Sequence, residues 1–114
     1  MNDIEELTRL NIEIGNAESR GDKNWLNEHI APRLAFRRAN KEKTVDCREE
    51  FLDKVKQSDD RKTEVQSVEI HGDTAVVKCI VIVNTKGDPK YQNLRLFVRE
   101  PDGWKLLGWA NEPL

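Results

Sequence analysis

The hydrophobic pattern of this chain changes its period close to residue 61, and this change constrains the fold more than any other feature. Before the polar segment "QSDDRK" at 57–62, apolar residues recur every three or four positions, which is the spacing of one face of an amphipathic helix. After it, apolar and polar residues alternate, which is typical of half-buried strands. The sequence therefore predicts an α+β fold, with helices gathered in the first half and antiparallel strands in the second.

Three helices are predicted in the first half, each from its terminal residues. Asn2 caps the first helix and Gly21 ends it. Asp22 caps the second helix, which lies in the segment "GDKNWLNEHIAP" and ends before Pro32. Asp46 and Glu49 form a capping box for the third helix. We expect this third helix to bury a stripe of four side chains, namely Cys47, Phe51, Leu52 and Val55.

The other predicted elements are strands. One covers 33–39, and four more follow at 62–70, 74–84, 90–99 and 104–111. The turn sequences "HGD", "KGDP" and "EPDG" join the last four, which makes them antiparallel hairpins. Val65 and Val68 are both apolar but differ in parity, so we expect a β-bulge near Ser67. The element order is α-α-β-α-β-β-β-β, a single domain over residues 1–114 whose helices pack in the concavity of a curved, mostly antiparallel sheet.

Composition and charge exclude several classes of function. With 19 basic and 21 acidic residues, the chain has no positive excess to attract nucleic acid. Its two cysteines and two histidines form no metal-binding motif, and no glycine-rich phosphate loop is present, so we expect neither metal nor cofactor. The acidic start is unlike a signal peptide, and the longest apolar run, "CIVIV", is too short to cross a membrane. We therefore expect a cytoplasmic protein that does not bind membranes.

Several segments, in this order, resemble the nuclear transport factor 2-like superfamily, whose fold is also called cystatin-like. They are "SRGD", "NWLNEHIAP", "RLAFRRAN", "CREEFLDKV" and "GWKLLGWANE", and within the superfamily they are most similar to small bacterial SnoaL-like proteins of unassigned function. The resemblance implies a cone-shaped domain with a central, mostly apolar pocket between the sheet and the helices. It implies no single activity, because members include ketosteroid isomerases, polyketide cyclases, dehydratases and epoxide hydrolases, as well as proteins that catalyse nothing.

The resemblance argues against ketosteroid isomerase activity. Those enzymes use an aspartate base and an oxyanion hole made of a tyrosine and a protonated aspartate. Alignment on "GD" places the base at Arg38 and the tyrosine at Ile14, and the protonated aspartate falls near Leu94. None of these side chains has the required chemistry, so we leave catalytic residues unassigned and expect the three to line the pocket.

The consecutive arginines Arg37 and Arg38 follow a strand that begins with apolar residues. Because Phe36 should face the core, alternation turns Arg38 inward and Arg37 outward. A buried guanidinium needs an anion. Three interpretations are open for Arg38: it has an internal partner such as Glu13 or Glu112, it binds the carboxylate or phosphate of a ligand, or its long side chain reaches out to solvent.

Three hypotheses for function follow. The first is a small-molecule-binding domain that anchors an acidic, apolar ligand through Arg38, with Trp109 stacking on the ligand and Asn111 hydrogen-bonding to it. The second is an isomerase, cyclase or dehydratase whose acid–base group has moved to another titratable side chain, the candidates being Glu13, Glu18, His29 and Tyr91. The third is a non-catalytic module for dimerisation or for binding a partner.

We also expect a homodimer. The strand "AVVKCIVIV" is apolar on both faces, whereas the helices can cover one face of the sheet. The other face should then pack against a second copy of the chain. On the strand that follows, Arg95 alternates with two leucines, so we expect Arg95 to face solvent or this interface.

Overall fold

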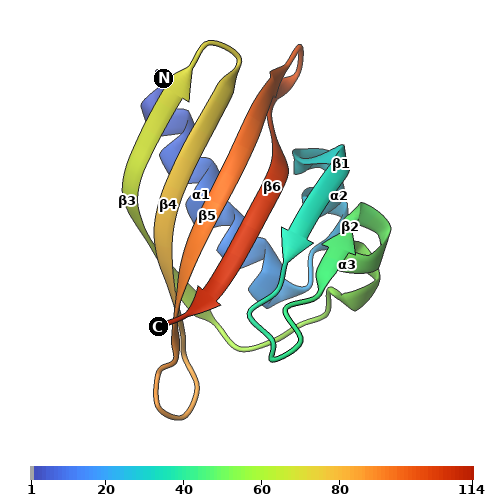
Figure 1. Cartoon of the computed structure of the whole chain (residues 1–114), viewed down its shortest axis with the longest axis vertical. Helices are drawn as coiled ribbons and strands as arrows, with labels where there is room; N and C mark the ends of the chain where they lie inside the picture. Colours follow the sequence, from blue (N-terminus) through green and yellow to red (C-terminus); the bar gives the residue numbers. More distant parts are fainter. Residues whose placement is uncertain (1) are drawn as a thin grey trace.

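The computed structural model describes residues 2–114, which form three α-helices and one six-stranded sheet (Figure 1). The helices are α1 (Asp3–Arg20), α2 (Lys23–His29) and α3 (Arg48–Lys54). The strands are β1 (Ile30–Arg37), β2 (Val45–Cys47), β3 (Arg61–His71), β4 (Thr74–Val83), β5 (Lys90–Glu100) and β6 (Gly103–Pro113). None of the helices within residues 2–114 is long and apolar enough to cross a membrane.

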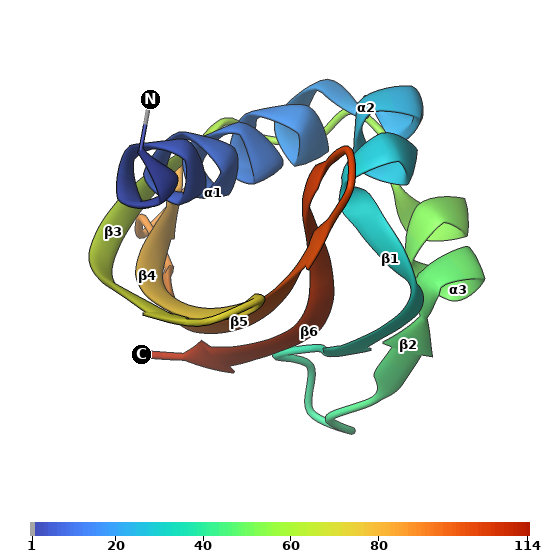
Figure 2. The same ribbon diagram turned by 90° about the horizontal axis from the view of Figure 1, so that it is seen from above.

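The sheet has the strand order β2-β1-β6-β5-β4-β3, and its pairs are antiparallel except for β1 with β6. It curls around α1, which lies across the open side of the curve (Figure 2). The predicted α+β fold and its curved, mostly antiparallel sheet are confirmed, although the short strand β2 was not predicted. The predicted bulge is also present, since the β3–β4 register shifts between Val65 and Ser67.

Helix α1 begins and ends as its sequence predicts. The side chain of Asn2 accepts a hydrogen bond from the backbone N–H of Glu5 at 2.9 Å. Gly21 ends the helix in the left-handed region, with φ of 71°, and a Cβ there would lie 2.5 Å from the backbone nitrogen of Gln57. Glycine is therefore required at this turn, both for its backbone conformation and for the close approach of the segment that leads into β3.

The core lies between α1 and the concave face of the sheet. Leu7, Val77 and Leu106 are fully buried there. Three buried aromatic rings extend the core toward α3: Phe36 stacks on Trp109 with 4.1 Å between ring centroids, and Phe51 meets Trp109 edge-on at 5.5 Å. Strand β1 and helix α3 are thus held against β6 by aromatic packing.

The start of α3 differs from the prediction by one residue. Cys47, not Asp46, is the N-cap, and the backbone N–H of Cys47 donates to the carboxylate of Glu50 at 2.9 Å. Cys47 is exposed and is not part of the buried stripe. The physical reason is that Asp46, only 2% exposed, is held in β2 by ionic hydrogen bonds from Arg38 Nε at 2.5 Å and Lys54 Nζ at 3.1 Å.

These two bonds make Asp46 a buried anion. Burial opposes its ionisation, but the hydrogen bonds from Arg38 and Lys54 outweigh burial and hold the pKa of Asp46 below its ordinary value. We predict that Asp46→Asn lowers the free energy of unfolding at pH 7 by about 1.5–3 kcal/mol, the range for hydrogen bonds to charged groups. Urea unfolding measures this loss.

The loss should depend on pH with a defined sign. Since the pKa of Asp46 is lower in the folded chain, its contribution is complete above the unfolded-state value near 3.8, decreases below that value, and is lost as the pH falls through the lower folded-state pKa. Glu112→Gln is the control, because Glu112 also binds two cations, Arg37 and Lys43, but is half-exposed. Exposed pairs contribute about 0–1 kcal/mol. Equal losses for the two variants would contradict a special role for Asp46.

Candidate functional site

A cavity of about 350 Å³ opens where the end of α1 meets the ends of β1, β3, β4, β5 and β6. Of its eleven lining residues, eight carry a polar or charged group, so the prediction of a mostly apolar pocket is wrong. The lining residues are Glu18, Arg38, Ala39, Asn40, Arg61, Val81, Val83, Tyr91, Asn93, Trp109 and Asn111.

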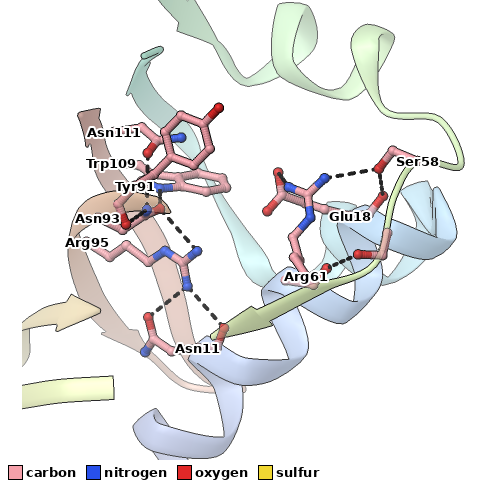
Figure 3. Close-up of polar contacts among 11 residues, drawn as sticks. Asn11, Glu18, Ser58, Arg61, Tyr91, Asn93, Arg95, Trp109 and Asn111 are labelled. Carbon is pink, nitrogen blue, oxygen red and sulfur yellow. Dashed lines mark hydrogen bonds and ion pairs between the residues drawn. The ribbon is translucent and has the colours of Figure 1, made fainter. Parts of the chain in front are cut away.

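The floor beneath this cavity is built on Arg95, which is 0% exposed. Its NH1 donates to the backbone carbonyl of Asn11 at 3.0 Å and to the Oδ1 of Asn11 at 3.2 Å, and its NH2 donates to Asn93 Oδ1 at 3.3 Å (Figure 3). Burial lowers the pKa of Arg95. The expectation that Arg95 faces outward is wrong, because the two leucines beside it, Leu94 and Leu96, occupy the outward positions of β5.

Asn93 connects this floor to the wall of the cavity. Its Oδ1 also accepts a hydrogen bond from Trp109 Nε1 at 2.6 Å, and its amide donates to Asn111 Oδ1 at 3.1 Å. The strands that carry Arg95 and Phe36 lie on opposite sides of the strand that carries Trp109. The Arg95 guanidinium carbon lies 4.8 Å from the Trp109 ring centroid, and Phe36 stacks on the same ring. Trp109 therefore presents an edge to the cavity, not a free face on which a ligand could stack.

The opposite wall carries Glu18 and Arg61, which face Tyr91 and Asn111 across the cavity (Figure 3). Arg61 NH1 lies 3.5 Å from Glu18 Oε2, and Arg61 NH2 donates to Ser58 Oγ at 3.0 Å. Burial raises the pKa of Glu18, and the charges of nearby arginines, Arg61 first, oppose this rise. The sequence named Glu18 as a titratable candidate but missed Arg61. Arg61 lies two and four residues before Thr63 and Val65, which face inward on the same strand, and this spacing could have indicated that Arg61 also faces inward.

Arg38 follows β1 and lines the cavity, whereas Arg37 lies on the outer face and pairs with Glu112. The alternation predicted for the two arginines is thus present. The internal partner of Arg38 is Asp46, which was not among the two carboxylates considered from the sequence. Periodicity could not reveal this pair, because Asp46 lies on a strand that the sequence did not predict.

Two other predicted lining residues are not in the cavity wall. Ile14 is 1% exposed and packs in the core one turn before Glu18. Leu94 is 44% exposed on the convex face, because Asn93 and Arg95 hold the inward positions of β5. Both predictions are therefore wrong. For these two residues the family alignment identified an element near the cavity but not the side of the element that faces it.

The remaining titratable candidates, Glu13 and His29, lie elsewhere. They line a second hollow of about 280 Å³ between α1, α2 and the β5–β6 turn. His29 Nδ1 is 2.7 Å from the carbonyl of Trp25, and the two rings stack at 3.9 Å. Within residues 2–114, no group of three or more His, Cys, Asp or Glu side chains is placed to hold a metal ion.

No family model matches the chain, and no curated protein matches it. Solved structures do match its fold. A nuclear transport factor 2-like protein of unknown function from Silicibacter pomeroyi DSS-3 is 17% identical, with a TM-score of 0.81 and 100% of both chains covered. A proposed dehydratase of the same fold family from Streptomyces avermitilis is 21% identical, with a TM-score of 0.80 over 98% of this chain and 96% of the other.

A third similar structure is a proposed Ca/calmodulin-dependent kinase II association domain from Exiguobacterium sibiricum 255-15. It is 18% identical, with a TM-score of 0.77 over 100% of this chain and 95% of the other. At these identities the comparisons define the fold and no function. The chain has the nuclear transport factor 2-like, or cystatin-like, fold, as its sequence predicts.

The polar floor of the cavity generates a stability prediction. Asn93→Leu removes the acceptor of Trp109 Nε1 and of one Arg95 nitrogen. Each buried donor that is left without an acceptor costs about 1–3 kcal/mol, so we expect the free energy of unfolding to fall by at least that amount. Adding Arg95→Met should recover part of the loss, because the uncompensated charge is then removed as well. Denaturant unfolding of the two single variants and the double variant measures this coupling, and strictly additive losses would contradict it.

Proposed function

We propose that the cavity binds a small carboxylate with an apolar body. The observation that supports this function is the local balance of charge. Two arginines, Arg38 and Arg61, line the cavity, and Arg95 lies beneath it. Among the described residues, the carboxylates at this end of the molecule within 4 Å of these guanidinium groups are Glu18 and Asp46, and Asp46 is shared with Lys54. The excess positive charge favours an anion.

The donors around the cavity suit a carboxylate. Asp46 takes the Nε of Arg38, which leaves the two terminal nitrogens of Arg38 without a protein acceptor among residues 2–114. The Nε of Arg61 is buried and has no hydrogen-bond partner in the same part of the chain. A guanidinium can hold a carboxylate through two parallel hydrogen bonds. Val81 and Val83 supply an apolar wall for the rest of the ligand, and Asn111 supplies a polar rim.

Benzoate is a suitable probe, since it combines a carboxylate with a small apolar ring. We predict that Arg61→Met weakens benzoate binding by about 1.5–3 kcal/mol, roughly ten- to hundredfold in Kd, because it removes a charge-assisted contact. Arg38→Met should also weaken binding. It should in addition lower the free energy of unfolding, because the buried carboxylate of Asp46 loses its hydrogen bond from Arg38. Titration calorimetry measures both effects.

Arg37→Met is the matched control. It removes the same charge from the adjacent position, but on the outer face, where Arg37 pairs with Glu112. Its benzoate affinity should stay within about twofold of the parent protein, because the net-charge change is identical and only the cavity contact differs. If Arg37→Met and Arg61→Met weaken binding equally, the effect is general electrostatics and the proposed site is wrong.

A second candidate function is acid–base catalysis of the isomerase, cyclase or dehydratase type. Glu18 favours it, because this buried carboxyl has a raised pKa and lies across the same cavity from Tyr91. One structural neighbour is a proposed dehydratase. Such an enzyme would exchange a carbon-bound proton of its substrate with D₂O, and Glu18→Gln would stop this exchange.

We propose in addition that the chain forms a homodimer through the convex face of the sheet. An apolar patch on this face consists of Val76, Leu94, Leu96 and Ala110, on three adjacent strands. Leu94 and Leu96 are 44% and 37% exposed. Exposed patches of this kind mark interaction sites, and an interface between two copies should bury more than about 1,000 Å². One neighbour is a proposed association domain, which is consistent with assembly.

For the dimer, we predict that Leu94→Glu yields monomers, because two copies of the new charge would be buried close together at a two-fold interface. Ile12→Glu is the control, since Ile12 is a similarly exposed apolar residue on α1, away from the sheet face. Light scattering at micromolar concentration should give twice the chain mass for the parent and for the Ile12 variant. A parent mass of one chain would refute the dimer.

A further inference from the structure

The contact between Glu18 and Arg61 is incomplete. Their nearest atoms, Glu18 Oε2 and Arg61 NH1, are 3.5 Å apart, which is an ion pair at the limit of hydrogen-bond distance. Both side chains are largely buried, at 16% and 18% exposure. Within residues 2–114 the buried Nε of Arg61 has no acceptor. Arg61 lines the cavity and therefore has a donor that is not used even while Glu18 is next to it.

There is room for Glu18 to be displaced. Glu18, Arg38 and Arg61 also line a further hollow of about 220 Å³, bounded by α3 and the segment that leads from it to β3. The three charged side chains thus separate two hollows. A carboxylate arriving from the larger cavity could take over Arg61 while the Glu18 carboxyl turns toward the smaller one.

The charges around Glu18 come from every element packed against it. Arg61 is the nearest, and its charge, with those of Arg95 and Arg38, favours ionised Glu18, whereas burial disfavours it. Cys79 is a buried thiol whose pKa is raised by burial, so it is neutral near pH 7. Among residues 2–114, the titratable or charged groups that line the two hollows, act on Glu18 or pair with these groups are Arg38, Asp46, Lys54, Lys56, Arg61, Cys79, Tyr91 and Arg95.

We propose that binding of a carboxylate ligand is coupled to the uptake of one proton. The ligand carboxylate pairs with Arg61 in place of Glu18, and Glu18 accepts a proton from solvent and becomes the neutral acid. This inference rests on the proposed anion-binding function and extends it to the coupling between ligand binding and protonation of Glu18. Two carboxylates that share one guanidinium repel each other, so one of them binds a proton. Glu18 is the one, because its side chain is only 16% exposed and burial disfavours its ionised form once the ligand has displaced it from Arg61.

The coupling determines how affinity depends on pH. At a pH where Glu18 is ionised in the free protein, binding takes up as much as one proton, so the Kd of the ligand rises with pH, approaching tenfold per pH unit. At a lower pH, where Glu18 is already protonated, the Kd becomes independent of pH. A ligand that bound beside an unchanged Glu18 would show no such dependence.

The experiment is calorimetric titration of the parent protein with benzoate from about pH 6 to 7.5, where benzoate stays ionised and both buffers hold the pH. Each pH is measured in imidazole and in bis-tris, two amine buffers that differ in ionisation enthalpy and do not compete as anions. The difference in heat gives the number of protons taken up. We expect uptake approaching one proton at the upper end of this range, and no uptake on titration with the neutral analogue benzamide.

Two variants separate Glu18 from other groups. Glu18→Gln should bind benzoate with no proton uptake and with a Kd that no longer rises with pH. Glu13→Gln, a change of the same kind on α1 at a residue that lines the other hollow, should keep the proton uptake of the parent. If Glu18→Gln does not fold, a ¹³C NMR titration of the Glu18 carboxyl in the parent, with and without benzoate, replaces it, and its pKa should rise on binding.

The outcomes distinguish the two proposals. Benzoate binding without proton uptake, or uptake that persists in Glu18→Gln, would overturn the coupling and leave the anion site in place. Absence of benzoate binding at every pH, in the parent and in Glu18→Gln, would overturn the anion site and the coupling with it. Loss of uptake in Glu18→Gln alone supports the coupling.

Discussion

The buried guanidinium of Arg95 constrains the rest of this structure. A cation with no exposure to water must be surrounded by dipoles, since leaving it unpaired in the interior costs far more than the fold could tolerate. Here the dipoles come from two elements: the backbone and side chain of Asn11 on α1, and the side chain of Asn93 on β5. The position of α1 across the sheet is therefore set by a polar contact as well as by apolar packing.

That contact also explains why the cavity is polar. Asn93 is held by Arg95 from below and by Trp109 and Asn111 from the neighbouring strand, so its amide group cannot turn into the cavity as an independent ligand group. Trp109 is fixed between Phe36 and Arg95. The groups left free to meet a ligand are Arg61 and Glu18 on the opposite wall and the terminal nitrogens of Arg38. Binding chemistry is thus concentrated where the packing is least complete.

The sequence predicted elements well because their signals are local. Caps defined α1 and α2, and a change of parity revealed the bulge near Ser67. A second bulge, where the β5–β6 register shifts between Leu96 and Phe97, brings Leu106 to the buried face of Trp109, whereas strict alternation from Trp109 would place Leu107 there. It left no trace in the sequence, because both residues are leucine and a shift between them changes no pattern of polarity.

Candidate site residues were harder to predict. Alternation divides the residues of a strand between two faces, but it does not say which of the two faces the core. For Arg37 and Arg38 the face was identified by Phe36, and the prediction was correct. On β5 the same reasoning failed, since the apolar Leu94 and Leu96 face outward. The prediction for Asp46 was wrong for a related reason. The burial of its carboxylate depends on Arg38 and Lys54, each eight residues away in the sequence, and no local pattern reveals these pairs.

Strand β5 is inverted relative to an ordinary half-buried strand, and this inversion connects the two surfaces for which we propose functions. Asn93 and Arg95 face the concave side and make the polar floor, while Leu94 and Leu96 face the convex side and make the apolar patch. A one-residue slip of β5 would exchange these sets and place leucines under the cavity and an arginine on the outer face. The hydrogen bonds of Arg95 prevent that slip, because only the observed register brings its guanidinium to Asn11. One buried cation therefore fixes at once the floor of the ligand cavity and the apolar face of the proposed dimer.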